Sequence, residues 1–424
     1  MAVERQINPG FTRRRFMKGA LLGAGAVASA SNWDLAQALA TGKTARDVHG
    51  YGVDSGQVAI GSNENPLGPS PRAVAAIAEN LHSINRYDFG VDLLVRLNQR
   101  HGIIGDDAQF NLGMNDMRAF MKFREVNRIM VTPGSGPILQ TLAVMAASEG
   151  GECIEAVPGY GQIARAFQGF QMAGKDVKVV RVPTTGDFTH DLEAMEMAIT
   201  PRTKLVTITN PNNPTGTIVP YEKLAAFVNA VPEHVIVLID EAYIDFVRQA
   251  NYQDGVKLAL ERDNVVVART FSKIYGLAGL RIGYAIAGRR IIDLMMVHLG
   301  FFGGGLSSLG SYAALAALDD DEFVHRTKKV VNDGKDYLAA EFDRMGLKYT
   351  PSHGNFLIVD VKRNSGRMTM ELRKRGVMVR SGAVYRTRNQ DPLKNHLRVS
   401  IGTMDELEVF INELSDILSG PKQG

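Results

Sequence analysis

The chain has 424 residues, of which 45% are hydrophobic and 22% charged, and this composition excludes a disordered chain or a collagen-like or coiled-coil fibre. The length predicts two or three domains, and the single cysteine, Cys153, excludes an intrachain disulfide and a thiolate zinc cluster. The net charge of +3 comes from the first 30 residues, which hold five basic residues and one acid and leave 43 basic and 44 acidic residues elsewhere. We therefore expect no nucleic acid partner.

The first 40 residues have the parts of an export signal. A basic region around Arg13, Arg14 and Lys18 precedes an uncharged apolar stretch over 19–30, which ends in Ala28-Ser29-Ala30, a possible cleavage site. The stretch is shorter than the roughly 20 residues that span a bilayer. The Arg13-Arg14 pair resembles a twin-arginine signal, so we expect the twin-arginine machinery to export the folded protein to the periplasm. The alternative is an arginine cluster on a disordered tail.

From residue 128 onward, short runs rich in Val and Ile alternate with helical patterns. The runs are nearly continuous in hydrophobicity, which is typical of strands covered on both faces. They predict strands at 128–132, 152–157, 177–182, 204–209, 235–240, 264–268 and 282–287. Helices are expected between them, at 137–148, 160–172, 192–199 and 222–230. The pattern predicts an α/β fold with a mostly parallel, seven-stranded sheet.

After about residue 310 the pattern changes to longer, charged helices around short strands. Helices are expected at 322–345 and 404–418, and strands at 356–361, 377–379 and 397–401. We predict a smaller α/β domain at 311–424, a large domain at 89–310 and an N-terminal arm at 41–88.

Three polar segments follow three successive predicted strands. They are Asn-Pro-Asn-Asn-Pro-Thr-Gly at 210–216, Asp-Glu-Ala-Tyr at 240–243, and residues 270–281, which contain Ser272-Lys273 and Arg281. Taken singly they could be a turn, a helix cap and a solvated lysine. Together they predict a ligand site, because open α/β sheets bind ligands at the carboxyl ends of their strands.

With these segments the chain resembles the fold-type-I pyridoxal-phosphate enzymes, in particular the class I/II aminotransferases of the histidinol-phosphate aminotransferase group. The resemblance covers about residues 62–403. It also rests on Asn63-Glu-Asn-Pro66, Arg86-Tyr87, Pro158-Gly-Tyr160, Gly354-Asn-Phe356 and Leu397-Arg398-Val-Ser-Ile-Gly402. It implies a large domain that binds pyridoxal 5'-phosphate, a small C-terminal domain, and a homodimer with a shared active site.

The resemblance assigns roles around the cofactor ring. Lys273 would bind the cofactor covalently and then shuttle the substrate proton, and Asp240 would keep the pyridine nitrogen protonated. Asn213 and Tyr243 would donate to the phenolate oxygen. Tyr160 would stack on the ring.

The resemblance also implies residues for the cofactor phosphate and the substrate. The phosphate would be bound by backbone N–H groups, hydroxyls and one guanidinium, from Gly134, Ser135, Gly136, Thr270, Ser272 and Arg281. Tyr87 would reach a phosphate in the other subunit. Arg398 would bind the substrate α-carboxylate, with Arg380 and Asn65 as further substrate residues.

The chain departs from the family pattern mainly on the substrate side. Asn65 stands where an aromatic residue is common, Gly303-Gly304-Gly305 replaces the usual residues after the interdomain helix, and 109–127 is extra length. The nine histidines are scattered singly, so no metal site is expected.

The expected function is amino transfer from an amino acid, or an amino-acid-like donor such as histidinol phosphate, to a 2-oxo acid. Two alternatives stay open. The same motifs would serve another pyridoxal-phosphate reaction on an amino acid, namely that of a decarboxylase, a carbon–sulfur lyase or an oxidase. The other alternative is a non-catalytic ligand-binding protein.

Overall fold

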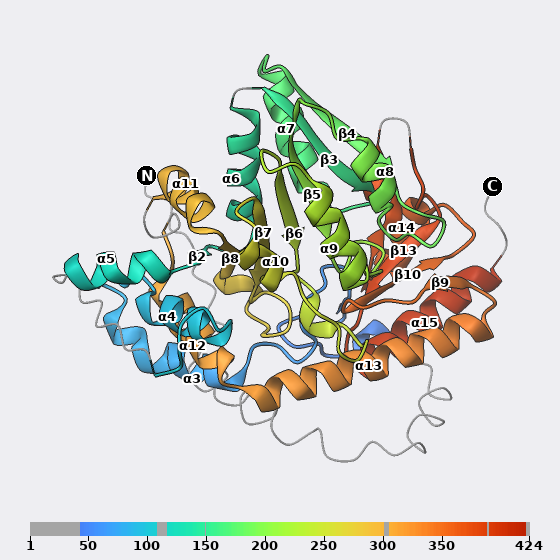
Figure 1. The fold of residues 1–424 in the computed structure, drawn as a ribbon. Coiled ribbons are helices and arrows are strands. Elements are labelled where there is room, and N and C mark those ends of the chain that lie inside the picture. Colours follow the sequence, from blue (N-terminus) through green and yellow to red (C-terminus); the bar gives the residue numbers. More distant parts are fainter. Residues whose placement is uncertain (1–42, 108–116, 149, 301–304, 388–389, 421–424) are drawn as a thin grey trace, which may run out of the picture.

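A computed structural model describes residues 43–107, 117–148, 150–300, 305–387 and 390–420 (Figure 1). The predicted export signal, residues 109–116 of the extra segment, and Gly303 and Gly304 lie outside these residues. Among the described residues, no helix is both long and apolar enough to cross a membrane.

The large sheet has seven strands in the order β2-β8-β7-β6-β5-β3-β4. Strand β8 is antiparallel to both of its neighbours, and the other pairings are parallel, which confirms the predicted mostly parallel sheet. The strands are β2 (Ile129–Thr132), β3 (Gly151–Val157), β4 (Val177–Pro183), β5 (Thr203–Thr209), β6 (Ile236–Asp240), β7 (Val265–Thr270) and β8 (Gly283–Ala287).

Helices cover both faces of this sheet, which explains why its central strands are apolar at consecutive positions. Alternate residues such as Cys153, Leu205 and Leu238 pack under α6 (Gly136–Ala147), α7 (Gln162–Met172) and α11 (Arg289–Leu299). The residues between them pack under α8 (Leu192–Met197), α9 (Tyr221–Ala230) and α10 (Val256–Glu261). Cys153 is fully buried and unpaired in the first of these cores.

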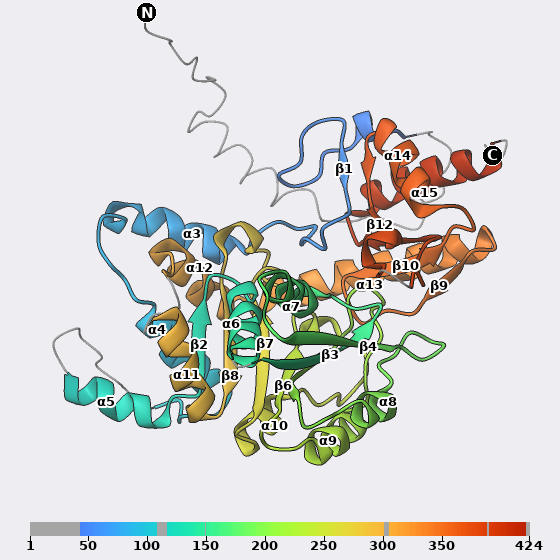
Figure 2. The ribbon, with the colours of Figure 1, turned by 90° about the horizontal axis from the view of Figure 1, so that it is seen from above.

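The small domain is built on a four-stranded antiparallel sheet, and its elements group on one side of the large sheet (Figure 2). The strand order is β12 (Arg380–Ser381), β13 (His396–Ser400), β10 (Phe356–Asp360) and β9 (Lys348–Thr350). Helix α14 (Ser365–Lys374) packs against β12 and β13, and α15 (Met404–Ser419) packs against α14 and α13. The N-terminal arm joins this domain, because β1 (Val58–Ala59) pairs in parallel with β11 (Val377–Met378).

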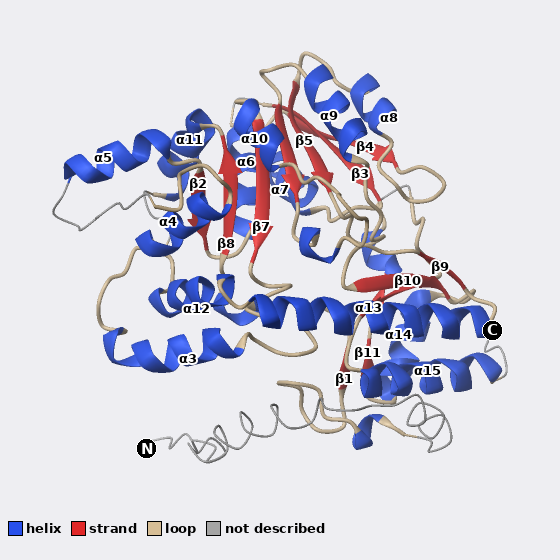
Figure 3. Cartoon of the chain, turned by 60° about the horizontal axis from the view of Figure 1, so that its bottom comes forward, coloured by secondary structure: helices blue, strands red, loops and turns tan. Residues whose placement is uncertain are grey.

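A single 24-residue helix, α13 (Asp321–Arg344), connects the two parts (Figure 3). It begins beside α12 (Ser308–Leu318), which packs against α3 (Pro71–Asn80) and α4 (Val91–Arg100); α5 (Met117–Val126) follows α4 along the chain. The Ser70 hydroxyl, which caps α3, donates to the Asp320 carboxylate, which caps α13, at 2.6 Å. The helix starts are thereby fixed to each other. The domain boundaries at 88 and 310 stay a prediction.

A buried ion pair fixes the ends of the central strands β6 and β7. Two nitrogens of Arg269 bind the same Glu241 oxygen at 2.7 and 3.0 Å, and the Glu241 side chain is fully buried. The other Glu241 oxygen accepts from the Gly255 N–H at 2.6 Å. Asp240 and Thr270 neighbour this pair in sequence, so the pair fixes the backbone from which they project.

Replacing Arg269 with Ala should destabilise the cofactor-free protein by about 3–5 kcal/mol, because Glu241 would be left buried without its charge partner. Urea unfolding measures this. The control is Lys257→Ala, which breaks an exposed pair with Glu261 and should cost at most about 0.5 kcal/mol. Equal stability of the two variants would contradict a structural role for the buried pair.

Candidate active site

The three polar segments found in the sequence lie together at one edge of the large sheet. Strands β5, β6 and β7 are adjacent and parallel, and the segments 210–216, 240–243 and 270–281 come at or directly after their carboxyl ends. The edge of a parallel sheet therefore brings together side chains that are up to about seventy residues apart in sequence.

Lys273 lies in the loop between β7 and β8 and points to the N-terminal arm. Its amine donates to the backbone carbonyls of Asn63 at 3.0 Å and Ser62 at 3.3 Å. Burial is the main cause that lowers the pKa of Lys273 to about 8, and the charge of Arg398 contributes. Part of the amine is therefore unprotonated near neutral pH, as a nucleophile requires.

Asp240 ends β6 and is 4% exposed. Its carboxylate accepts one hydrogen bond within the described residues, from the Ala242 N–H at 3.2 Å. Burial raises the pKa of Asp240 to about 6, against the opposing effects of this hydrogen bond and of Lys273. A desolvated carboxylate of this kind suits a cationic partner such as a protonated ring nitrogen.

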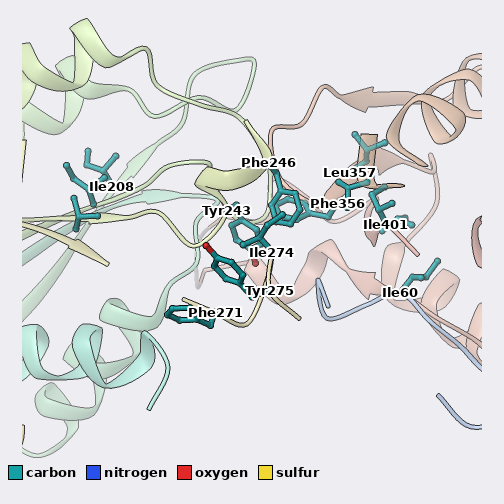
Figure 4. Close-up of a cluster of buried hydrophobic side chains, with 14 of the residues drawn as sticks. Ile60, Ile208, Tyr243, Phe246, Phe271, Ile274, Tyr275, Phe356, Leu357 and Ile401 are labelled. Carbon is teal, nitrogen blue, oxygen red and sulfur yellow. The ribbon is translucent and has the colours of Figure 1, made fainter. Parts of the chain in front are cut away.

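Tyr243 lies between the arm and the small domain. Its hydroxyl oxygen accepts from the side-chain amides of Asn63 at 2.9 Å and Asn213 at 3.4 Å, so its own hydrogen can be donated elsewhere. Its ring meets Phe356 edge-on, with the ring centroids 5.1 Å apart (Figure 4). Burial raises the pKa of Tyr243, which keeps the hydroxyl protonated at neutral pH.

A corner suited to a phosphate lies where β2 leads into α6. Gly134 has a φ of +82°, and a side chain there would collide with the Arg281 guanidinium. Arg281 donates to the Ser272 hydroxyl at 3.4 Å, and the Thr270 hydroxyl donates to the same oxygen at 3.0 Å. Ser135 and Gly136 begin α6, where free N–H groups favour an anion. Hydroxyls, a guanidinium and a helix start thus converge here.

Arg398 is buried on β13, 5% exposed, and faces the same space from the small domain. It donates to the Tyr385 hydroxyl at 2.7 Å, to the Asn213 side-chain oxygen at 2.8 Å and to the Gly61 carbonyl at 2.7 Å. Its Nε has no protein partner in the described part of the chain. Arg380 is exposed and lies opposite Arg398 in the β12–β13 pairing. The site therefore has one buried and one exposed arginine on its small-domain side.

Three further residues predicted for the site have other surroundings than Lys273, Asp240 and Tyr243. Tyr160 is partly exposed and lines a small cavity together with Asp240. Asn65 uses its amide on the backbone, donating to the carbonyls of Ile274 at 2.9 Å and Lys273 at 3.3 Å. Tyr87 is 92% exposed and stacks on Phe89, and no described contact connects it to Lys273.

Asn63 and Tyr385 were not assigned a role from the sequence, although both lie in the site. Asn63 binds Tyr243 through its amide nitrogen, accepts from Ser400 at 2.8 Å and offers its carbonyl to Lys273. Its φ of +55° is a conformation that asparagine tolerates better than most residues. The Asn-Glu-Asn-Pro motif was the available signal for Asn63, whereas Tyr385 has no comparable local pattern.

Comparison with known proteins agrees with this geometry. The sequence profile of the family described as aminotransferase class I and II matches residues 55–414, so the chain belongs to that family. A histidinol-phosphate aminotransferase of Moorella thermoacetica is 39% identical over 364 residues, which cover 85% of this chain and 86% of that protein. Histidinol-phosphate aminotransferase 1 of Nitrosococcus oceani is 38% identical over 371 residues, 87% and 90% of the two chains.

Solved structures show the same fold. A putative histidinol-phosphate aminotransferase from Erwinia carotovora atroseptica superposes with a TM-score of 0.72 at 26% identity, covering 85% of this chain and 96% of that one. Histidinol-phosphate aminotransferase from Sinorhizobium meliloti, in complex with pyridoxal-5'-phosphate, has a TM-score of 0.70 at 24% identity, covering 85% and 91%. The expected fold-type-I architecture is thereby confirmed.

The protein is accordingly a pyridoxal-phosphate-dependent aminotransferase, as the sequence predicted. The residues described above fit this cofactor. Lys273 supplies an amine of lowered pKa, Asp240 a buried carboxylate without a strong partner, and the corner at Gly134 and Arg281 a place for the phosphate.

Asp240→Asn should stabilise the cofactor-free protein at pH 8. The folded pKa of about 6 lies above the ordinary value of 3.8, so the folded state binds this proton more tightly and stability falls as pH rises between these values. Removing the carboxyl should therefore raise the free energy of unfolding by about 2–3 kcal/mol at pH 8 but little at pH 4.

Urea unfolding at a series of pH values checks this prediction. Asp333→Asn, on the exposed face of α13, is the control and should change little at either pH. If Asp240→Asn lost stability at both pH values, groups of the protein itself would already stabilise the charged Asp240 carboxylate without the cofactor.

Proposed function

We propose that Lys273 is the residue that binds pyridoxal phosphate covalently, and that the donor is an amino acid or an amino-acid-like amine with an anionic group, such as histidinol phosphate. The observation that carries this proposal is the placement of the Lys273 amine, with its lowered pKa, beside Asp240 and Tyr243 at the edge of the sheet. The 38–39% identical relatives named histidinol-phosphate aminotransferase support the choice of donor.

Pyridoxal phosphate supplies an electron sink for the negative charge that develops when the donor loses its α-proton. The Lys273 amine would hold the cofactor and, once freed by the donor amine, would carry that proton from the donor α-carbon to the cofactor carbon on the other side of the donor nitrogen. Asp240 would keep the ring nitrogen protonated. The Tyr243 hydroxyl and the Asn213 amide would donate to the ring oxygen, and Tyr160 would pack against the ring face.

We assign the phosphate to the corner formed by Gly134, Ser135, Gly136, Thr270, Ser272 and Arg281. The glycine permits close approach of the backbone, and the guanidinium of Arg281 matches the geometry of phosphate oxygens. The start of α6 adds the favourable end of its dipole.

The donor's anionic group is proposed to bind Arg398. The guanidinium is already fixed by Tyr385, Asn213 and Gly61, so little conformational freedom is lost on binding. Arg380 opposite it is exposed and can meet a second anionic group at the entrance. The Asn65 amide binds the backbone of the Lys273 loop, so Asn65 would affect the donor only by holding that loop.

A homodimer is proposed because Tyr87 is exposed on the described chain. It lies with Ile84 and Arg86 on the wall of an open cleft of about 510 Å³, whose other wall is residues 306–309. A second copy of the chain would cover this surface, on which Ile84 and Tyr87 are exposed, and receive the Tyr87 hydroxyl at its cofactor phosphate.

Export to the periplasm by the twin-arginine machinery is also proposed, on the basis of residues 1–40, which lie outside the described structure. A cofactor made in the cytoplasm can be carried out only by a protein that folds around it first. A twin-arginine route would meet that requirement.

Lys273→Ala should keep the fold, lose the visible absorbance of the lysine-bound cofactor and lower kcat by at least about 10³-fold, because both the covalent link and the proton carrier are removed. Spectra and a transamination assay over a panel of donors and 2-oxo acids measure this. The control is Lys335→Met, since Lys335 is a second buried lysine, with a pKa lowered to about 7, in α13.

The same assay separates the alternatives. Amino transfer requires the 2-oxo acid, so product formed at an undiminished rate without an acceptor would indicate a decarboxylase, lyase or oxidase. Native turnover in Lys273→Ala would make the assignment of this lysine wrong.

Arg398→Lys should raise KM for donors with an α-carboxylate by about 10- to 100-fold, because the charge stays while the paired hydrogen bonds are lost. Steady-state kinetics with a carboxylate donor and a matched amine lacking the carboxylate measure this. The amine should be little affected. A uniform loss for both donors would mean that Arg398 serves mainly to hold Asn213 and Gly61 in place.

Residues 1–45 fused to a reporter that folds in the cytoplasm should direct it to the periplasm. Changing Arg13 and Arg14 together to Lys should retain it inside, because the guanidinium pair is lost while the charge is kept. Cell fractionation measures this, with Arg5→Lys as the control. Normal export of the double-lysine fusion would indicate an ordinary secretory signal.

A further inference from the structure

A small cavity lined in part by polar side chains lies beside Asp240, under helix α7. It leaves about 10 Å³ for the centre of a water molecule, which is close to the minimum needed to hold one water. Asp240 alternates with Leu238 on β6, and Thr207 with Leu205 on β5, so both side chains face the layer of α6 and α7. The polar residues that line the cavity are Glu155, Tyr160, Gln162, His190, Thr207, Thr209 and Asp240.

Two of these polar groups lack the hydrogen bonds that burial requires. The Thr207 hydroxyl is buried and has no partner in the described part of the chain. Asp240 receives a single hydrogen bond there, from Ala242, although a carboxylate can accept several. Buried polar groups without partners are costly, and an internal water is a common way to satisfy them.

His190 offers a third hydrogen-bonding group to this cavity. It is 6% exposed, and its Nε2 accepts from the Thr209 N–H at 3.4 Å. Burial lowers the pKa of His190 to about 4, so the ring is neutral and its hydrogen is on Nδ1. The imidazole can therefore donate without adding a charge.

We propose that one water molecule occupies this cavity and donates to Asp240, and that Thr207 and His190 are positioning residues that hold the water there. The role of this network rests on the proposed function, in which Asp240 must stay charged opposite the cofactor nitrogen. The water offers two donors and two acceptors, enough to satisfy the Thr207 hydroxyl, the His190 N–H and one Asp240 oxygen together.

The network lowers the affinity of Asp240 for protons, because hydrogen bonds to a carboxylate stabilise its charged form. The hydrogen bond from Ala242 lowers the pKa of Asp240 more than the charge of Lys273 does, so hydrogen bonds carry much of this stabilisation. The titratable groups that line the cavity with Asp240 are Tyr160 after β3, Glu155 on β3 and His190 before α8. Lys273 from the β7–β8 loop and Tyr243 after β6 act on Asp240 from outside the cavity.

The test is the dissociation constant of pyridoxal phosphate, measured by titrating the cofactor-free protein between pH 5 and 9. Affinity should fall at acid pH as Asp240 is protonated. The acid limb is the pH range over which this affinity falls. Thr207→Val, which removes only the hydroxyl, should move the acid limb upward by about one pH unit, because losing a hydrogen bond to a charged carboxylate raises its pKa by about that amount. Thr207→Ser keeps the hydroxyl and should leave the limb near its native position.

Thr203→Val is the matched control on the same strand. Its hydroxyl accepts from the Thr200 N–H at 2.9 Å at the other end of β5, so the substitution should reduce stability without moving the acid limb. His190→Leu should shift the limb in the same direction as Thr207→Val. His190→Gln, whose amide carries both an acceptor and a donor, should shift it less. This pair gives a second reading if Thr207→Val folds poorly.

An unchanged acid limb in Thr207→Val and His190→Leu would overturn the proposal, as would an equal shift in Thr203→Val. Asp240→Asn separates this failure from a failure of the proposed function. If the acid limb disappears in Asp240→Asn but is native in Thr207→Val, Asp240 acts without the network. If the limb persists in Asp240→Asn, the assignment of Asp240 itself is wrong.

Discussion

The burial of one carboxylate, Asp240, at the end of the central strand β6 is the constraint on which the rest of the site depends. Strand β6 has apolar neighbours on both faces, so the residue at its carboxyl end meets little water. Burial raises the pKa of Asp240 and lowers that of Lys273. Each group is therefore shifted toward its neutral form. A cofactor with a basic ring nitrogen would give Asp240 a cationic partner, and its electrophilic carbon would give the Lys273 amine a group to react with.

The N-terminal arm connects this part of the large domain to the small domain through hydrogen bonds. Asn63 binds Tyr243 of the large domain and Ser400 of the small domain, and its carbonyl receives the Lys273 amine. Arg398 reaches Gly61 of the arm and Asn213 of the large domain. The arm therefore lies between the two domains, and the position of the reactive amine depends on both.

The two sides of the site differ in how they are built. The proposed cofactor side consists of strand ends and the start of α6, fixed by a rigid sheet and by the buried pair of Glu241 and Arg269. The proposed donor side consists of β12, β13 and Tyr385 in the small domain, where Arg380 is exposed. Differences between donors are therefore expected to depend on the small domain, whereas the cofactor chemistry depends on the large one.

The sequence by itself determined the mostly parallel seven-stranded sheet and the polar segments at its strand ends, because hydrophobic runs and strand termini are local features of the chain. Local pattern also indicated Lys273, Asp240 and Arg281, through the resemblance that their spacing supports. It did not reveal that β8 is antiparallel to its neighbours, since strand direction depends on how the chain crosses the sheet.

Only the tertiary structure decided which side chains bind one another. The bond from Asn63 to Tyr243 joins residues 180 positions apart, and the one from Arg398 to Asn213 joins residues 185 apart. It also placed the Asn65 amide on the backbone of the Lys273 loop, and grouped Thr207 and His190 beside Asp240. Such contacts depend on the packing of distant segments, and the composition and periodicity of each segment alone do not encode that packing.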